Sequence, residues 1–399
     1  MSLELSKKMS RITPSYTLEI TAKAKALKAA GKDIVSFGAG EPDFNTPLNI
    51  QNAGIEAIKS GKTRYTTTTG IVELKEAIID KLKRDQNIDY KKSEIVVSNG
   101  AKQSLFNALS VILDTNEEVI LPTPYWVSYP EMVKLAGGVP LYVEVKEEDG
   151  FIYDLDALES AYNKNVKAIL INSPNNPTGA VYSEKTLIDI YNWAKEKDIF
   201  IISDEIYEEL IYGDTKHFSV ASICEDAKKR TILINGMSKA YAMTGWRIGY
   251  LAADEAIVGA INKFQAHSTS NACSISQYAS VEGLNGDKKV ISEMREAFNK
   301  RRIYMVDRVN KINGLSCKEP KGAFYVMINI TECIGKTFEG EKIENSLDFS
   351  NILLERSDVA VIPGKAFGDE RYIRLSYATD LDSIEKGLDR IDAFVQKLK

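Results

Sequence analysis

The sequence predicts an α/β protein whose large domain holds a mainly parallel β-sheet covered by helices on both faces, together with a smaller α+β domain. Three observations lead to this fold class. From about Pro47 onward, short runs rich in β-branched residues alternate with helical stretches. Amphipathic segments separate several of these runs. Beyond about residue 285 the pattern changes to long helices with two separate strands.

The predicted sheet takes its strands from runs spread over the first two thirds of the chain. They read EIVVSNG, EVILPTP, PLYVEV, KAILINS, IFIISDE, TILINGMSK and RIGYLAA. We assign residues 47–284 to this large domain. Ligands of such sheets bind beyond the carboxyl ends of the strands, so the residues that follow each run are the candidate site residues.

The smaller α+β domain is predicted from both ends of the chain, residues 1–46 and 285–399. Residues 287–313 read as a long charged helix, and GAFYVMINI and YIRLSYA read as strands. The chain then ends in an amphipathic helix. Ser6 to Ala30 is expected to be helical in part and, with IVSFGAGEPDF, to join this C-terminal portion.

Composition argues against several classes of protein. The 399 residues carry a formal net charge of −5, and Lys and Arg are spread along the chain, which argues against a nucleic-acid partner. No stretch approaches the roughly 20 apolar residues of a membrane span. MSLELSKKMS lacks the apolar centre of a signal peptide, so we expect a cytoplasmic protein. The four cysteines are scattered and the chain has two histidines, so no metal site is predicted.

A turn that follows the run EIVV and opens a helix is a candidate anion site. In SNGAKQSLFNAL, the backbone N–H groups of Gly100, Ala101 and Lys102 would point outward with the helix dipole behind them. This arrangement suits a phosphate group. The alternative is that Gly-Ala serves only the packing of a strand-to-helix turn.

Three charged residues follow other strands of the predicted sheet. Asp204 ends IFIIS, where it could either face a ligand or cap a helix. Lys239 follows TILINGMS, and confinement near an apolar cleft and other cations would lower its pKa and make its amine a nucleophile. Arg247 could pair with a phosphate.

Three further residues each have a functional and a structural interpretation. Asn176 in SPNNPTG could expose its amide at a strand end or simply form a turn. Trp126 in PTPYWVSYP could stack on a planar ring or lie in the core. Arg374 in YIRLSYA could bind a carboxylate with both arms of its guanidinium or form a structural ion pair.

The order and spacing of these motifs resemble the class I aminotransferases among the fold type I pyridoxal-phosphate enzymes. The resemblance is strongest to the bacterial aspartate aminotransferases, and it spans nearly the whole chain. It rests on GAGEPDFNTP, TRYTTTTG, PYWVSYPEM, SPNNPTGA, SDEIYE, MTGWRIGY, GAFYVM and IRLSYAT.

The resemblance implies pyridoxal 5'-phosphate as cofactor and assigns the residues around its ring. Lys239 carries the cofactor as a Schiff base and later acts as the base, and Asp204 pairs with the pyridine nitrogen. Asn176 and Tyr207 hold the phenolic oxygen, and Trp126 stacks on the ring. Lys239, Asp204 and Tyr207 are the implied catalytic residues.

The resemblance also implies a phosphate site, a substrate site and a homodimer. Ala101, Lys102 and Arg247 would bind the phosphate, and Tyr65 of the partner subunit would reach it, which places the active site at a subunit interface. Arg374 would bind the substrate α-carboxylate. The residues that complete that pocket are Gly40, Trp126 and Asn176.

Two details of the family pattern bear on this chain. Many members have a serine three residues before the lysine as a phosphate ligand, but this chain has Gly236 there, and Ser238 is the nearer hydroxyl. Thr123-Pro124 and Asn176-Pro177 are cis in similar enzymes, and we expect the same here.

The expected reaction is ping-pong transfer of an amino group between aspartate and 2-oxoglutarate. Lys102 is the candidate for the distal carboxylate, and the alternative is a solvated surface lysine. FQAHSTSNACS, which resembles a loop near the partner's site, contains no arginine. Aromatic, alanine or prephenate transamination and C–S lyase activity are alternatives on the same cofactor. Two other classes of protein are not favoured. A regulatory protein of this fold would need a DNA-binding head, and a nicotinamide dehydrogenase would need a G-x-G-x-x-G motif, and the sequence shows neither.

Overall fold

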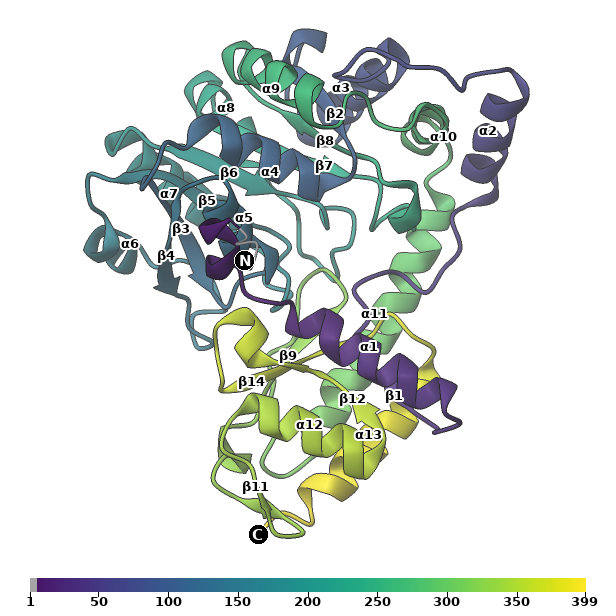
Figure 1. Ribbon diagram of the computed structural model, residues 1–399, viewed down its shortest axis with the longest axis vertical. Coiled ribbons are helices and arrows are strands. Elements are labelled where there is room, and N and C mark those ends of the chain that lie inside the picture. Colours follow the sequence, from purple (N-terminus) through teal and green to yellow (C-terminus); the bar gives the residue numbers. More distant parts are fainter. Residues whose placement is uncertain (1–5) are drawn as a thin grey trace, which may run out of the picture.

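A seven-stranded sheet forms the centre of the larger part of the molecule (Figure 1), in a computed structural model that describes residues 6–399. Residues 1–5, which begin the stretch that argues against a signal peptide, lie outside the described residues. Adjacent strands of this sheet run parallel to each other, except that β8 runs antiparallel to both of its neighbours. The predicted mainly parallel sheet is therefore confirmed. In spatial order the strands are β2 (Ile95–Ser98), β8 (Gly249–Ala252), β7 (Thr231–Gly236), β6 (Phe200–Asp204), β5 (Val166–Asn172), β3 (Glu118–Thr123) and β4 (Val139–Glu144).

Helices cover both faces of this sheet, as predicted. Side chains alternate between the faces: in β6, Ile202 packs in the cluster of one helix group and Ile201 in the cluster of the other. Burial on both faces explains why these strands are apolar throughout. One face carries α4 (Ala101–Ile112), α5 (Ser128–Leu135) and α9 (Glu255–Ser268). The other carries α3 (Val72–Gln86), α6 (Leu155–Ala161), α7 (Glu184–Glu196) and α8 (Glu225–Arg230).

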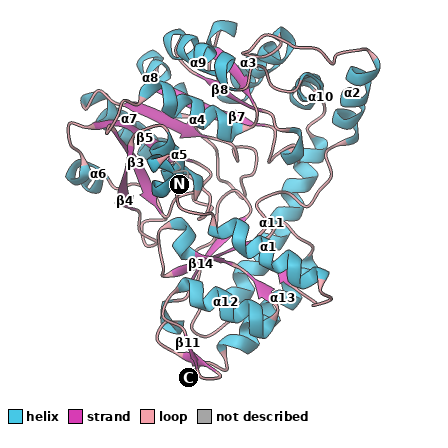
Figure 2. Ribbon diagram, viewed as in Figure 1, coloured by secondary structure: helices cyan, strands magenta, loops and turns pink. Residues whose placement is uncertain are grey.

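A smaller α+β part lies below this sheet in Figures 1 and 2. Its antiparallel sheet has the order β13-β14-β9, and β1 from the N-terminal segment pairs in parallel with β12. The domain limits at residues 47 and 284 stay predictions. The strands are β1 (Val35–Ser36), β9 (Tyr325–Asn329), β12 (Val359–Ala360), β13 (Ile362–Pro363) and β14 (Tyr372–Ser376), with a small hairpin of β10 (Thr337–Phe338) and β11 (Glu341–Lys342). The helices are α1 (Tyr16–Ala29), α11 (Lys289–Val309), α12 (Ser346–Ser357) and α13 (Leu381–Val395).

Helix α11 is shorter than the predicted helix over residues 287–313, because it spans only Lys289–Val309. Two remaining helices, α2 (Leu48–Lys59) and α10 (Ser274–Asn285), pack on each other beside α3. Within residues 6–399, no helix is long and apolar enough to cross a membrane.

Strand β8 approaches the start of α4 closely, and this places two predicted site residues, Ala101 and Arg247, near each other. A Cβ atom on Gly249 would lie 2.1 Å from the backbone nitrogen of Ala101, so only glycine fits at this point. Gly100 has a φ of 84°, and a Cβ there would lie 2.4 Å from Nη2 of Arg247. The two glycines therefore allow the Arg247 guanidinium to lie against the first turn of α4.

We predict that Gly249→Ala destabilises the protein by about 3 kcal/mol, the upper end for an overpacked site, because the added methyl group meets backbone atoms that cannot rotate away. Gly259→Ala in α9 is the matched control. Its Cβ meets no atom within 4 Å, and replacing a helix-interior glycine should stabilise by about 1 kcal/mol. Chemical unfolding midpoints measure both effects, and equal midpoints for the two variants would contradict the prediction.

Candidate active site

One cavity of about 960 Å³ gathers nearly all the residues that the sequence nominates. It lies at the carboxyl ends of the strands, where residues of both parts of the molecule meet. The exceptions are Gly100 and Tyr65, which do not line the cavity; Tyr65 is 93% exposed. The nominated residues that line the cavity are Gly40, Ala101, Lys102, Trp126, Asn176, Asp204, Tyr207, Ser238, Lys239, Arg247 and Arg374.

Asp204, at the end of β6, presents a buried carboxylate to the cavity. The Tyr129 hydroxyl donates to Oδ2 at 2.7 Å, and the backbone N–H of Ile206 donates to Oδ1 at 3.3 Å. Among residues 6–399, no cation forms an ion pair with this carboxylate. Burial raises the pKa of Asp204 to about 6, and the Tyr129 hydrogen bond opposes this rise. No helix follows β6 directly, so the helix-cap interpretation of Asp204 is wrong.

Lys239 reaches the cavity from the turn after β7. Its ammonium donates to the Gly40 carbonyl at 2.5 Å and lies 5.6 Å from the centre of the Tyr207 ring. Burial lowers the pKa of Lys239 to about 8, and the nearby charge of Arg374 lowers it further. A substantial fraction of this amine is therefore neutral near pH 8 and able to attack a carbonyl carbon.

Arg374, on β14, is a buried guanidinium with unused hydrogen-bonding capacity. Nη1 donates to the Asn176 side chain at 3.0 Å, and Nη2 donates to the Gly38 carbonyl at 3.3 Å. Within the described part of the chain it forms no ion pair, and its Nε has no partner. The structural ion-pair interpretation is therefore wrong. A buried arginine with no counter-charge is suited to bind an anion that enters the cavity.

The start of α4 and Arg247 lie together as the anion-site prediction requires, except that the Gly100 N–H is not a free donor, because it donates to the Ser98 carbonyl at 2.8 Å. Ala101 and Lys102 are the first two residues of α4, where backbone N–H groups have no partner within the helix. Arg247 donates from Nη1 to the Thr244 carbonyl at 3.0 Å and from Nη2 to the Asn99 carbonyl at 3.3 Å. These two contacts hold the guanidinium beside the helix N-terminus, which favours an anion such as phosphate.

Trp126 lines the cavity and is not a core residue. It is partly exposed, and the ammonium of Lys102 lies 4.9 Å from the centre of its ring. Burial lowers the pKa of Lys102, and the charge of Arg247 adds to the effect. Lys102 lines the cavity, but its side chain is exposed, so the distal-carboxylate role and the solvated-surface alternative both stay predictions.

The departure from the family pattern at Gly236 has a packing reason. A Cβ atom there would lie 2.8 Å from Gly249 Cα and 2.9 Å from the Ile248 carbonyl oxygen, so a serine would clash with β8. Ser238 lines the cavity instead. The two expected cis bonds, Thr123-Pro124 and Asn176-Pro177, are confirmed, and Ser173-Pro174 is cis as well.

Three residues of the site were not found from the sequence. Tyr129 binds Asp204, and the hydroxyls of Tyr325 and Tyr207 lie 3.0 Å apart. The Asn172 side chain donates to the Asp204 carbonyl at 2.9 Å and accepts from the Asn176 N–H at 2.8 Å. Of these three residues, Asn172 alone had a signal in the sequence, because it ends a strand of the predicted sheet, where site residues are expected.

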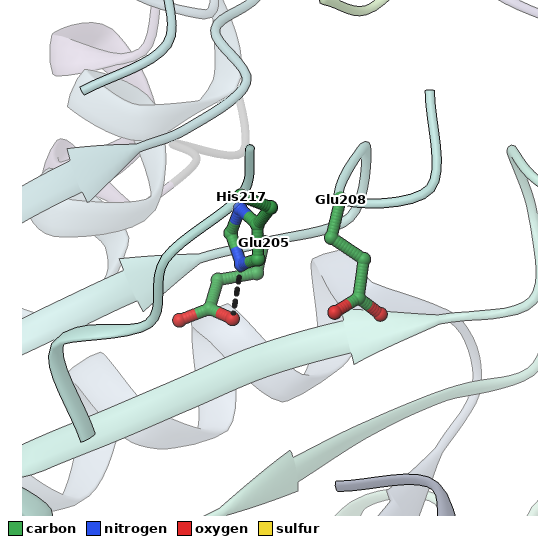
Figure 3. A group of neighbouring side chains, drawn as sticks. All are labelled: Glu205, Glu208 and His217. Carbon is green, nitrogen blue, oxygen red and sulfur yellow. Dashed lines mark hydrogen bonds and ion pairs between the residues drawn. The ribbon is translucent and has the colours of Figure 1, made fainter. Parts of the chain in front are cut away.

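A cluster of possible metal ligands, Glu205, Glu208 and His217, lies behind the end of β6 (Figure 3). Their ligand atoms lie within 4.8 Å of one another. His217 Nε2 lies 2.9 Å from Glu205, as the dashed line in Figure 3 marks, and the buried Lys81 pairs with Glu208. Gln86 donates to both carboxylates. These groups already occupy the carboxylate oxygens, so we interpret the cluster as a buried ion network.

Comparisons with known proteins agree with this geometry. The aspartate aminotransferase of Bacillus subtilis (strain 168) is 49% identical over 395 residues, which cover 99% of this chain and 100% of that protein. The probable aspartate/prephenate aminotransferase of Aquifex aeolicus (strain VF5) is 45% identical over 396 residues, 99% of each chain.

Solved structures of aspartate aminotransferases are also similar to this chain. The aspartate aminotransferase from Rhizobium meliloti superposes with a TM-score of 0.95 at 39% identity over 100% of both chains. That of Thermus thermophilus with maleate gives 0.93 at 38% identity over 98% of this chain and 100% of the other. The family model "Aminotransferase class I and II" matches residues 32–391. The chain therefore belongs to the class I and II aminotransferase family and is an aminotransferase.

Proposed function

We propose that this aminotransferase binds pyridoxal 5'-phosphate in the cavity and transfers the amino group of aspartate to 2-oxoglutarate. The observation that carries the proposal is a set of complementary unpaired charges around one cavity. The Asp204 carboxylate has no cationic partner among the described residues, and the Arg374 guanidinium has no anionic one. Lys239 lines the same cavity, and burial lowers its pKa.

The residues around the cavity fit this cofactor group by group. The α4 N-terminus and Arg247 suit its phosphate, and Asp204 suits its ring nitrogen. Trp126 offers an aromatic face to the ring. The Tyr207 hydroxyl would serve the ring hydroxyl together with Asn176, and burial raises the pKa of Tyr207 so that it stays protonated and can donate.

Pyridoxal phosphate, when bound, supplies an electron sink for negative charge that develops at the substrate Cα. Asp204 would hold a proton on the ring nitrogen through a charge-assisted hydrogen bond. Lys239 would hold the cofactor covalently, and its amine, when free, would move the substrate Cα proton. Arg374 would bind the α-carboxylate and orient the substrate, with Asn176 beside it and Gly40 lining the same cavity.

Aspartate is the proposed donor for two reasons. The relatives described above carry aspartate aminotransferase or aspartate/prephenate aminotransferase in their names, and the Thermus structure contains maleate, a dicarboxylate. In this chain Lys102 is a further cation at the cavity, besides Arg374, and would suit a distal carboxylate. Prephenate is the second candidate, because some relatives are named aspartate/prephenate aminotransferases. Alanine, other aromatic substrates and C–S lyase chemistry remain alternatives for the same residues.

The proposed active unit is a homodimer. Tyr65 projects into solvent at 93% exposure, and α2, which precedes it, exposes the apolar side chains of Leu48, Ile55 and Ile58. A second copy that covered this apolar surface would bury it and could receive Tyr65 at its own phosphate site. The cytoplasmic location stays a prediction.

The visible spectrum of the purified protein tests the main proposal. Protein loaded with pyridoxal phosphate should absorb in the visible range, and aspartate should convert that band to the one of the aminated cofactor. Adding 2-oxoglutarate should restore the first band, as a ping-pong cycle requires. Lys239→Ala is the control, because it should bind the cofactor without the covalent band. A protein that gains no visible band after cofactor addition would refute the proposal.

The pKa of Lys239 predicts how fast the cofactor attaches at each pH. Only the neutral amine attacks the aldehyde, and the pKa of Lys239 lies at about 8. The rate of band formation after mixing apoprotein with cofactor should therefore rise with pH up to about 8 and then level off. Stopped-flow absorbance measures it. A rate that keeps rising to about pH 10, as for an ordinary lysine, would contradict this prediction.

Replacing Lys102 tests the assignment of the distal carboxylate. We predict that Lys102→Met lowers kcat/KM for aspartate by about 10-fold to 100-fold, the effect of losing one charge-assisted contact. The value for alanine, which has no distal carboxylate, should change much less. The affinity for cofactor is measured in parallel, because the Lys102 backbone also belongs to the phosphate site. Equal losses for both substrates would assign Lys102 to the phosphate alone.

A further inference from the structure

We propose that Tyr129 is a positioning residue that fixes both Asp204 and Trp126, the two side chains assigned to the nitrogen and the face of the cofactor ring. This inference rests on the proposed function, because it concerns how the chain prepares the same cavity. Tyr129 lies in α5, has 1% exposure and lines the cavity.

The first part of the inference concerns the orientation of the Asp204 carboxylate. The Tyr129 hydroxyl donates to Oδ2 at 2.7 Å, and the Ile206 N–H donates to Oδ1 at 3.3 Å. Tyr129 supplies the one side-chain hydrogen bond to this carboxylate within residues 6–399. A short bond on one oxygen and a longer backbone bond on the other set the rotation of the carboxylate. Losing the phenol would leave only the longer bond.

The second part concerns the indole of Trp126. The rings of Trp126 and Tyr129 lie 5.1 Å apart at an interplanar angle of 81°, an edge-to-face contact. The Tyr129 N–H also donates to the Trp126 carbonyl at 2.9 Å. One buried side chain thus contacts the indole through its ring and the carboxylate through its hydroxyl, so the two groups keep a fixed separation.

A phenol is suited to this position because it donates a hydrogen bond without adding charge. A lysine or arginine there would form an ion pair with Asp204 and weaken the attraction of the carboxylate for a protonated ring nitrogen. Burial raises the pKa of Tyr129 well above its ordinary value, and the charge of Asp204 adds to the effect. Tyr129 therefore stays protonated and acts as a donor to the carboxylate.

The groups that face Asp204 come from three elements. Tyr129 belongs to α5, Lys239 to the turn after β7, and Glu205 and Tyr207 to the segment after β6. The Lys239 and Tyr129 contacts favour the carboxylate, whereas Glu205 disfavours it. Removing the phenol leaves the other groups in place, so Asp204 should take up a proton at a higher pH than before.

The experiment compares Tyr129→Phe with Tyr191→Phe. Tyr191 is a matched control because it is also buried and its hydroxyl donates to an aspartate, Asp226, at 3.0 Å, but it lies outside the cavity. Each variant loses one phenol-carboxylate hydrogen bond and keeps its ring. The measurements are cofactor affinity by equilibrium dialysis, the visible spectrum against pH without substrate, and kcat and KM for aspartate.

We expect Tyr129→Phe to bind the cofactor about 10-fold more weakly and to lower kcat about 10-fold with little change in KM, as for the loss of a hydrogen bond to a charged group. The acid limb of its spectral titration should move to higher pH. Tyr191→Phe should keep the wild-type affinity, spectrum and kcat. Tyr129→Leu, which also loses the ring contact with Trp126, should bind the cofactor more weakly than Tyr129→Phe.

Two outcomes would overturn the inference. One is a Tyr129→Phe variant with wild-type affinity, spectral titration and kcat. The other is a Tyr191→Phe variant that changes these quantities as much as Tyr129→Phe, because a general loss of stability would then explain both. Failure of the proposed function is a distinct result, since the wild-type protein itself would then form no visible band with the cofactor.

Discussion

The cavity depends on two buried charges of opposite sign that do not neutralise each other. Burying an ionised group without a counter-charge is costly, and a pair left in contact would form a salt bridge. Asp204 at the end of β6 and Arg374 on β14 are instead held apart, each by neutral partners. Tyr129 donates to one, and Asn176 accepts from the other. The protein thus keeps both charges available for groups that enter the cavity.

Asp204 and Glu205 are adjacent in the sequence, and they show how strongly the surroundings control the pKa of a carboxylate. Both are buried neighbours, yet burial raises the pKa of Asp204 while the pKa of Glu205 is lowered. Burial acts to raise the pKa of Glu205 as well, but the charge and hydrogen bond of His217 and the hydrogen bonds of two serine hydroxyls together outweigh it. Alternation along the strand sends the two side chains to opposite sides, one toward the cavity and one toward the ion network.

Backbone packing fixes the position of Arg247, just as side-chain contacts fix the position of Asp204. Gly249 allows β8 to approach α4, and Gly100 allows Arg247 to lie against the helix N-terminus. The same close approach of strands explains Gly236, where a serine would meet the backbone of β8. The phosphate site of this chain is therefore expected to depend on backbone donors and Arg247, with Ser238 as the nearest hydroxyl of the cavity.

The sequence by itself determined the fold class and nominated the cavity residues that the proposed chemistry uses. Strand runs of the α/β pattern are local features. Asp204 ends β6 and Lys239 follows β7, parallel neighbours whose carboxyl ends meet at one edge of the sheet, whereas Arg374 lies within β14 of the smaller part. Each of these residues had a structural alternative when considered singly. Their joint order in the family pattern separated the two interpretations, because a fold constrains motifs together.

The tertiary structure alone decided which contacts hold these residues. Tyr129 and Asp204 are 75 positions apart, and Asn176 and Arg374 are 198 apart, so no local pattern reveals their hydrogen bonds. It also decided that Trp126 lines the cavity, since a buried tryptophan and a cavity tryptophan have the same local sequence. Tyr65 shows the limit of a single chain: it lies far out in solvent, and the surface it serves belongs to a second copy in the proposed dimer. Distance in space, which sequence spacing does not encode, is the physical reason for each of these differences.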